Sequence, residues 1–380
     1  MPTPAPAAPL APAHPAAPPD PAAFGRAHNF TAGPGALPLD VLLELRDEIP
    51  AYGVLGATIF EVSHRSDAYD AIDASAKRLL RELLGAGEEW HVLFLQGGAT
   101  MQFHQVPLNF LRADASADYL NTGVWSAKAI EEARRFGRVN VAASSEDAAF
   151  SYIPDPAAWT LDANAAYLHY TSNNTIFGTE FHATPHAEVP LVCDASSDFL
   201  SRPLVLAPHG LVYAGAQKNL GPAGVTVVLV RESFLATRKP DVPPILDYGR
   251  HTGELFNTPP VFAVYLVEKV LRWLVRQGGV GAMDAAADRK SRALYDRIDR
   301  TDFYRGTVRP ASRSRMNVCF RLPTETLEAR FVRESEAAGL IGLKGHRLVG
   351  GLRASLYNAV PEASVAALVA FMDAFEAQHG

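Results

Sequence analysis

Lys218 is the residue of this sequence best placed to act as an amine nucleophile. It follows an apolar run at residues 211–214, and a turn rich in glycine and proline separates it from a second apolar run at residues 225–230. Both runs predict buried strands, and an ammonium group is costly to remove from water. A lysine in such a place can have a lowered pKa and react as a free amine. The alternative is a side chain that extends from a strand end into solvent.

A carboxylate is expected beside this lysine. Asp194 ends the apolar run at residues 190–194, one predicted strand before Lys218. A buried carboxylate costs free energy unless a cation or an N–H group satisfies it, and a protonated pyridine nitrogen would do so. The pair therefore predicts a pyridoxal-phosphate site. In it Lys218 forms the Schiff base, Asp194 pairs with the pyridinium, and Trp125 stacks on the ring.

A glycine-rich turn supplies a candidate site for the cofactor phosphate. A short apolar run at residues 92–95 leads into Gln96-Gly97-Gly98-Ala99-Thr100, which should open a helix. Backbone N–H groups at such a turn can hold a phosphate, and we expect Ala99 and Thr100 to contribute. The turn matches neither a Walker motif nor a dinucleotide fingerprint, so ordinary turn chemistry is the alternative.

The elements that must position these residues alternate between strand-like and helix-like segments. Between residues 39 and 282 this alternation predicts an α/β fold, a large domain whose mostly parallel central sheet is flanked by helices, with the site at the strand C-termini. A helix is expected at residues 261–276, with Thr258 as its N-cap. Residues 283–380 read as a smaller α+β domain, with a long helix at 284–299. Residues 24–38 form a turn-rich segment expected to pack near the active site and the small domain.

Composition excludes several other functions. The chain has 380 residues and a formal net charge of −6, which argues against a nucleic-acid partner. Its two cysteines, Cys193 and Cys319, predict neither a disulfide framework nor a metal site. No apolar run approaches the roughly 18 residues of a membrane span. Residues 1–23 are almost entirely alanine and proline and lack the features of a signal or transit peptide. They predict a disordered tail on a cytoplasmic protein.

Six motifs together carry a resemblance to a known family. They are NFTAGPGALP (29–38), EVSHR (61–65), FLQGGATMQF (94–103), AGAQKNLGPAG (214–224), FNTPP (256–260) and KGHRLVGGLRASLYNA (344–359). With them the chain, from about residue 29 to residue 380, resembles the phosphoserine aminotransferases. These belong to the class V, fold-type I enzymes that use pyridoxal 5′-phosphate. The resemblance implies a fold-type I large domain and a smaller C-terminal domain.

The resemblance also implies roles for the cofactor-binding residues. Lys218 matches the lysine that holds the cofactor and moves a proton, Asp194 the pyridinium partner, and Trp125 the stacking aromatic. Cofactor-phosphate and nearby contacts are matched by Ala99, Thr100 and Gln217. Thr175 matches the residue near the cofactor's 3′-oxygen. Asn257 and Thr258 match a pair that the second subunit donates to the phosphate, which implies a homodimer with shared active sites.

The implied reaction is a ping-pong transamination between L-glutamate and 3-phosphohydroxypyruvate, giving O-phospho-L-serine and 2-oxoglutarate in serine biosynthesis. Arg353 matches the α-carboxylate clamp, a task that suits a bidentate guanidinium. The phosphate or γ-carboxylate would be received by His64, Arg65, His346 and Arg347. Without the resemblance, each of these four is an ordinary surface cation. The family often also handles the phosphohydroxy-threonine analogue of pyridoxine biosynthesis.

Two places in the sequence depart from the family pattern. Some members have serine where this chain has Ala32, so here a contact to the amino acid would fall to the Ala32 backbone or to Thr31. Some members have glycine-arginine where this chain has Ala99-Thr100, so here the phosphate contact would rest on backbone N–H groups and a hydroxyl.

Three other activities are alternatives to this reaction. A cysteine desulfurase would need a reactive cysteine on a mobile loop. An alanine–glyoxylate transaminase would not need two His-Arg pairs, and a non-catalytic phosphate-binding or scaffold protein would not need Lys218.

Overall fold

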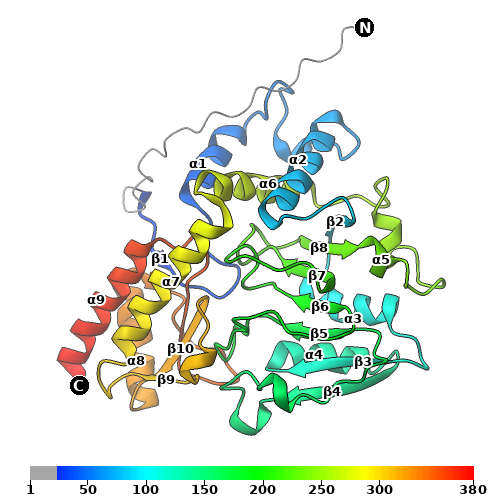
Figure 1. The fold of residues 1–380 in the computed structure, drawn as a ribbon. Coiled ribbons are helices and arrows are strands. Elements are labelled where there is room, and N and C mark those ends of the chain that lie inside the picture. The colour runs from blue at the N-terminus through cyan, green and yellow to red at the C-terminus, as the bar shows by residue number, and fades with distance from the viewer. Residues whose placement is uncertain (1–23) are drawn as a thin grey trace.

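The computed structural model describes residues 24–380, so the predicted disordered tail at residues 1–23 lies outside the described residues. Its largest feature is a seven-stranded sheet in the order β2-β8-β7-β6-β5-β3-β4 (Figure 1). All neighbouring strands are parallel except β8, which is antiparallel to both β2 and β7. The expected mostly parallel sheet is therefore confirmed. The strands are β2 (Trp90–Leu95), β3 (Ser116–Asn121), β4 (Arg138–Ser144), β5 (Leu168–Thr171), β6 (Leu191–Asp194), β7 (His209–Gly215) and β8 (Thr226–Arg231).

Helices cover both faces of this sheet because its strands are apolar on both sides. Along β8, Val227 and Leu229 pack into the core that includes α2 and α6, while Val228 and Val230 pack into the core that includes α3, α4 and α5. This two-residue alternation follows from strand geometry. The helices are α1 (Leu39–Glu48), α2 (Asp67–Leu84), α3 (Gly98–Phe110), α4 (Val124–Ala133), α5 (Glu232–Leu235) and α6 (Val261–Arg276).

The C-terminal part has its own sheet and core. Strand β10 (Asn317–Arg321) pairs antiparallel with both β9 (Arg305–Gly306) and β12 (Leu352–Ser355). The helices α7 (Gly279–Ile298), α8 (Glu325–Ala337) and α9 (Glu362–His379) pack around a separate apolar cluster. Helix α7 begins at Gly279 and continues across residue 283, so the long helix starts earlier than the sequence predicts.

The predicted cap of α6 is wrong. The N-cap residue of this helix is Pro260, and it makes no side-chain capping hydrogen bond. Two consecutive prolines separate Thr258 from the first helical turn, so its hydroxyl cannot reach the N–H groups that a cap satisfies. The Thr258 carbonyl instead accepts a hydrogen bond from the Gln96 side chain, 2.9 Å away.

The segment that precedes α1 connects the C-terminal part to the Lys218 turn. Strand β1 (His28–Asn29) pairs in parallel with β11 (Leu340–Ile341). The Tyr357 hydroxyl donates to the Ala32 carbonyl at 2.6 Å, and the Gly35 N–H donates to the Gln217 carbonyl at 2.7 Å. The segment therefore lies against the residue next to Lys218. Within residues 24–380, no helix is long and apolar enough to cross a membrane.

Candidate active site

Lys218 and Asp194 lie at the same edge of the central sheet. Asp194 is the last residue of β6, and Lys218 lies in the turn between β7 and β8. Burial lowers the pKa of Lys218 to about 8, an effect that nearby Asp194 opposes and that Arg353 reinforces. Burial also raises the pKa of Asp194, against the influence of Lys218. A lysine with a lowered pKa next to a buried carboxylate is an arrangement typical of functional sites.

The Asp194 carboxylate has capacity for another partner. Its side chain is only 4 % exposed, and the hydrogen bonds that it accepts within residues 24–380 come from Ser196, whose N–H lies 3.0 Å away. An ionised carboxylate can accept about four hydrogen bonds. A cationic ring nitrogen at this position would supply the missing interaction, so the geometry fits the predicted pyridinium partner.

Trp125, Thr175 and Arg353 are linked to one another at the same site. The Lys218 Nζ lies 5.9 Å from the centre of the Trp125 ring. The Trp125 Nε1 donates to the Thr175 hydroxyl at 2.8 Å, and the Arg353 Nη1 donates to the Thr175 carbonyl at 2.8 Å. The structure therefore brings these three predicted residues together with Lys218, through the segment that follows β5.

The glycine-rich turn opens α3 as predicted. Gly97 and Gly98 have φ angles of 94° and 65°, a region that residues with a side chain rarely adopt. Ala99 and Thr100 lie in the first turn of α3, whose N–H groups have no acceptor within the helix. The helix N-terminus can therefore hold an anion. Gln217, beside Lys218, is partly buried.

A second group of predicted residues gathers elsewhere on the chain. His64, Arg65, Asn257 and Thr258 line one cavity of about 440 Å³. Its walls include none of the residues around Lys218. The Asn257 amide also donates to the Gln96 side chain at 3.3 Å, so this group adjoins the glycine-rich turn of its own chain. A single chain thus divides the predicted site into two groups.

His346 and Arg353 line another cavity, of about 400 Å³. The pKa of His346 is lowered by burial and by three nearby cations, Arg353, Arg347 and Lys128. Arg347, the next residue, is exposed. Sequence reasoning missed Lys128, whose Nζ lies 5.1 Å from the centre of the Trp125 ring. Lys128 follows Trp125 by three residues on a predicted helix, and this spacing places both side chains on the same helix face, which is the signal that could have found it.

Thr31 and the Ala32 backbone, which were expected to contact the amino acid in place of the serine of some family members, already make local hydrogen bonds. The Thr31 hydroxyl is within 2.7 Å of both the Asn29 side chain and the Pro34 carbonyl, and the Ala32 carbonyl accepts a hydrogen bond from the Tyr357 hydroxyl.

The two cysteines do not suit a desulfurase. Cys193 and Cys319 are buried, and burial raises the pKa of both thiols, that of Cys319 to about 12.

Comparisons with known proteins show the family of this chain. The aminotransferase class-V family model matches residues 27–368. A phosphoserine aminotransferase of Pseudomonas aeruginosa is 50 % identical over 358 residues, which cover 93 % of this chain and 99 % of that protein. The phosphoserine aminotransferase structure from Bacillus circulans subsp. alkalophilus has a TM-score of 0.92 at 49 % identity, covering 94 % of this chain and 100 % of that one. The pyridoxal-phosphate-bound enzyme of Trichomonas vaginalis has a TM-score of 0.88 at 39 % identity, covering 92 % and 100 %. The chain therefore belongs to the class V aminotransferases, and within them to the phosphoserine aminotransferase family.

Proposed function

We propose that this aminotransferase moves an amino group from L-glutamate to 3-phosphohydroxypyruvate, giving 2-oxoglutarate and O-phospho-L-serine. The observation that carries the proposal is the Lys218 amine, with its lowered pKa, beside the buried Asp194 carboxylate. A neutral amine near the working pH is what proton transfer at carbon requires. Serine biosynthesis is the pathway to which this reaction belongs.

Pyridoxal 5′-phosphate is the cofactor that these residues fit. Lys218 would hold it covalently, Asp194 would pair with its ring nitrogen, Trp125 would cover one ring face, and Thr175 would lie near its 3′-oxygen. The first turn of α3, with Ala99 and Thr100, would receive the phosphate, and Gln217 would lie close by. When bound, the cofactor supplies an electron sink for the negative charge that develops at the substrate Cα.

The chain's own residues bind the substrate and move its proton. Arg353 binds the α-carboxylate that L-glutamate and 3-phosphohydroxypyruvate share, and its bond to the Thr175 carbonyl orients the guanidinium. The neutral Lys218 amine would move a proton from the substrate Cα to the cofactor in the first half-reaction, and would move a proton in the opposite direction in the second. Because its pKa is about 8, a useful fraction of this amine is neutral at physiological pH.

The distal anion of each substrate would be held by the two His-Arg pairs, His64 with Arg65 and His346 with Arg347. A phosphate and a γ-carboxylate are both suited to guanidinium and imidazolium donors. The 4-phosphohydroxy-L-threonine of pyridoxine biosynthesis has the same two charged ends. We therefore propose its formation as a second reaction of the same site.

A homodimer would unite the two groups of residues. Asn257 and Thr258, with the adjoining His64 and Arg65, would then serve the site of the partner subunit. Several large apolar side chains near this group are exposed in the single chain, which supports a protein contact here; they are Phe60, Met101, Leu255 and Phe256. We propose that the dimer works in the cytoplasm.

The proposed substrates are tested by comparing amino acceptors. Purified protein loaded with pyridoxal phosphate is given L-glutamate and either 3-phosphohydroxypyruvate or glyoxylate, and the amino-acid products are quantified. We expect O-phosphoserine from the first and at least about a hundredfold lower kcat/KM for glyoxylate, which lacks the distal anion. Equal rates would contradict the assignment, and Lys218→Ala is the inactive control.

A further inference from the structure

The segment that carries Thr175 is a small hairpin at residues 172–181. Its arms are joined by a bridge between Asn173 and Glu180, by a bond from the Asn174 N–H to the Thr179 carbonyl at 2.7 Å, and by one from the Phe181 N–H to the Ser172 carbonyl at 2.8 Å. Thr175 contacts Arg353 and Trp125. The placement of the carboxylate clamp therefore depends on what holds this hairpin.

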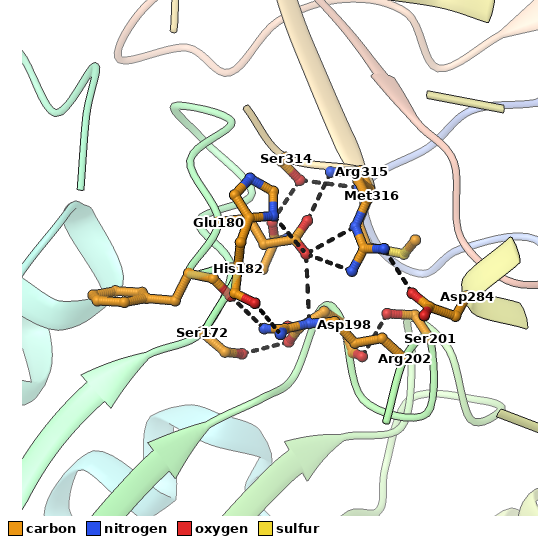
Figure 2. Close-up of polar contacts among 12 residues, drawn as sticks. Ser172, Glu180, His182, Asp198, Ser201, Arg202, Asp284, Ser314, Arg315 and Met316 are labelled. Carbon is orange, nitrogen blue, oxygen red and sulfur yellow. Dashed lines mark hydrogen bonds and ion pairs between the residues drawn. The ribbon is translucent and has the colours of Figure 1, made fainter. Parts of the chain in front are cut away.

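Glu180 is the charged residue at the base of the hairpin, and it is only 1 % exposed. One of its carboxylate oxygens accepts from the Arg315 N–H at 2.7 Å. The other lies 3.1 Å from the Arg315 Nη2 and 3.4 Å from the Arg202 Nε (Figure 2). A single buried carboxylate thus pairs with two guanidinium groups from different parts of the chain.

Arg202 connects Glu180 to the strand that ends at Asp194. Its Nη2 donates to the Phe181 carbonyl at 2.6 Å and to the Asp198 carboxylate at 3.2 Å. The Ser172 hydroxyl contacts Asp198 and also lies 3.1 Å from the Asp194 carbonyl (Figure 2 shows Ser172, Asp198 and Arg202). These contacts fix the hairpin base against the cofactor-binding edge of the large sheet.

Arg315 connects Glu180 to the C-terminal part. Its Nη1 donates to Asp284 at 2.6 Å and to Asp288 at 3.0 Å, both on α7. Arg315 also lies just before β10, and Cys319 on that strand pairs in register with Arg353 on β12. Glu180 therefore ties together the hairpin that presents the Thr175 carbonyl and the sheet that presents Arg353.

We propose that Glu180 is a positioning residue for Arg353, and that it sets how tightly the α-carboxylate of both substrates is bound. The proposal rests on the proposed function, in which Arg353 is the carboxylate clamp. Neutralising Glu180 would remove the carboxylate that two partly buried guanidinium groups, those of Arg202 and Arg315, share, and would loosen the hairpin base. A small displacement of Thr175 would then misalign the Arg353 guanidinium.

Glu180→Gln tests this role because glutamine keeps the shape and removes the charge. Glu268→Gln is the matched control, since Glu268 is also buried, at 5 % exposure, and pairs with Arg272 and Ser75 on helices away from the hairpin. For cofactor-loaded protein we would measure the Tm, the Kd for glutarate by calorimetry, and KM and kcat for both substrates. Glutarate has the two carboxylates of glutamate without the reacting amine.

We expect both variants to lose thermal stability, but only Glu180→Gln to weaken glutarate binding, on the order of tenfold. KM should rise by a similar factor for L-glutamate and for 3-phosphohydroxypyruvate, because they share the α-carboxylate, while kcat changes less. The absorption maximum of the bound cofactor should stay unchanged, since Lys218 and Asp194 are intact.

A lower Tm with unchanged glutarate affinity and unchanged KM would overturn the proposal and leave Glu180 a merely stabilising residue. If Glu180→Gln does not fold, Arg315→Lys takes its place, because it keeps the charge but loses the guanidinium geometry, and the same loss of affinity is expected. Failure of the wild-type protein to bind glutarate or to use L-glutamate would instead contradict the proposed function itself.

Discussion

At the scale of single residues, the pKa of Lys218 governs how the cofactor is attached. Burial lowers this pKa to about 8, so the neutral, reactive amine becomes the major form above that pH. For protein freed of cofactor, we expect the rate of covalent attachment of pyridoxal phosphate to rise with pH, with its midpoint near pH 8. The attachment is followed by its absorbance change.

The control for this prediction is Asp194→Asn. The Asp194 carboxylate favours the charged form of Lys218, so its removal should lower the lysine pKa further and shift the midpoint to lower pH. A midpoint near 10.5, the ordinary value for a lysine, would show that Lys218 is not in the environment described.

The roles of Lys218 and Asp194, which lie at strand ends, could be predicted from the sequence. The role of Glu180, which acts on Arg353 only through other residues, could not. Lys218 and Asp194 stand out because a charged side chain follows an apolar run. Glu180 has no such signal, because it becomes important only when Arg202 and Arg315, far apart in sequence, meet around it. Long-range charge pairing leaves no local pattern in a sequence.

At the scale of elements, the segment at residues 29–38 is packed tightly against the Lys218 turn. A Cβ added at Gly35 would lie 2.7 Å from the Tyr357 ring and 3.0 Å from the Lys218 carbonyl. We expect Gly35→Ala to destabilise the protein by about 1–3 kcal/mol and to slow cofactor attachment, because the Lys218 turn must shift. Denaturant unfolding and the attachment assay measure the two effects.

The matched control is Gly281→Ala on α7. Among residues 24–380, no atom outside its chain neighbours and the backbone of its own helix lies within 4 Å of a Cβ placed there, and the residue is in a helix. Replacing glycine by alanine inside a helix should stabilise the protein by about 0.5–1 kcal/mol without affecting attachment. If Gly35→Ala behaves like this control, the close contact with Lys218 is not important.

Most strands of the large sheet could be predicted because buried strands are apolar runs of typical length, but β4, in which only Ala142 is buried, is not such a run. The direction of each strand was harder to predict, because an apolar run is the same in a parallel and in an antiparallel strand. The connection from β7 to β8 contains no helix, which is the signal for the antiparallel pairing found there. The wrong cap of α6 arose from favouring Thr258 over the two prolines that precede the helix, of which Pro260 is the N-cap residue.

At the scale of the whole molecule, the proposed dimer predicts that two defective chains can restore activity together. Lys218→Ala removes the reactive amine, and Asn257→Ala with Thr258→Ala removes the donated pair. If the pair serves the partner subunit, a mixed dimer has one intact site. Refolding the two variants together should then recover about a quarter of wild-type activity, because half of the randomly formed dimers are mixed.

Each variant refolded alone is the control for this experiment and should stay nearly inactive. No recovery after mixing, with mixed dimers demonstrated by mass spectrometry, would mean that Asn257 and Thr258 act on their own chain. That result would agree with their hydrogen bonds to Gln96 of the same chain and would contradict the shared site.

The central claim is that Lys218 and the residues around it transfer an amino group in two separate half-reactions. The most direct test gives the cofactor-loaded protein L-glutamate alone and then, after removal of free amino acid, 3-phosphohydroxypyruvate. We predict about one equivalent of 2-oxoglutarate per site in the first step and one of O-phosphoserine in the second, with neither from Lys218→Ala. Absence of 2-oxoglutarate until both substrates are present, or an active Lys218→Ala variant, would contradict the account.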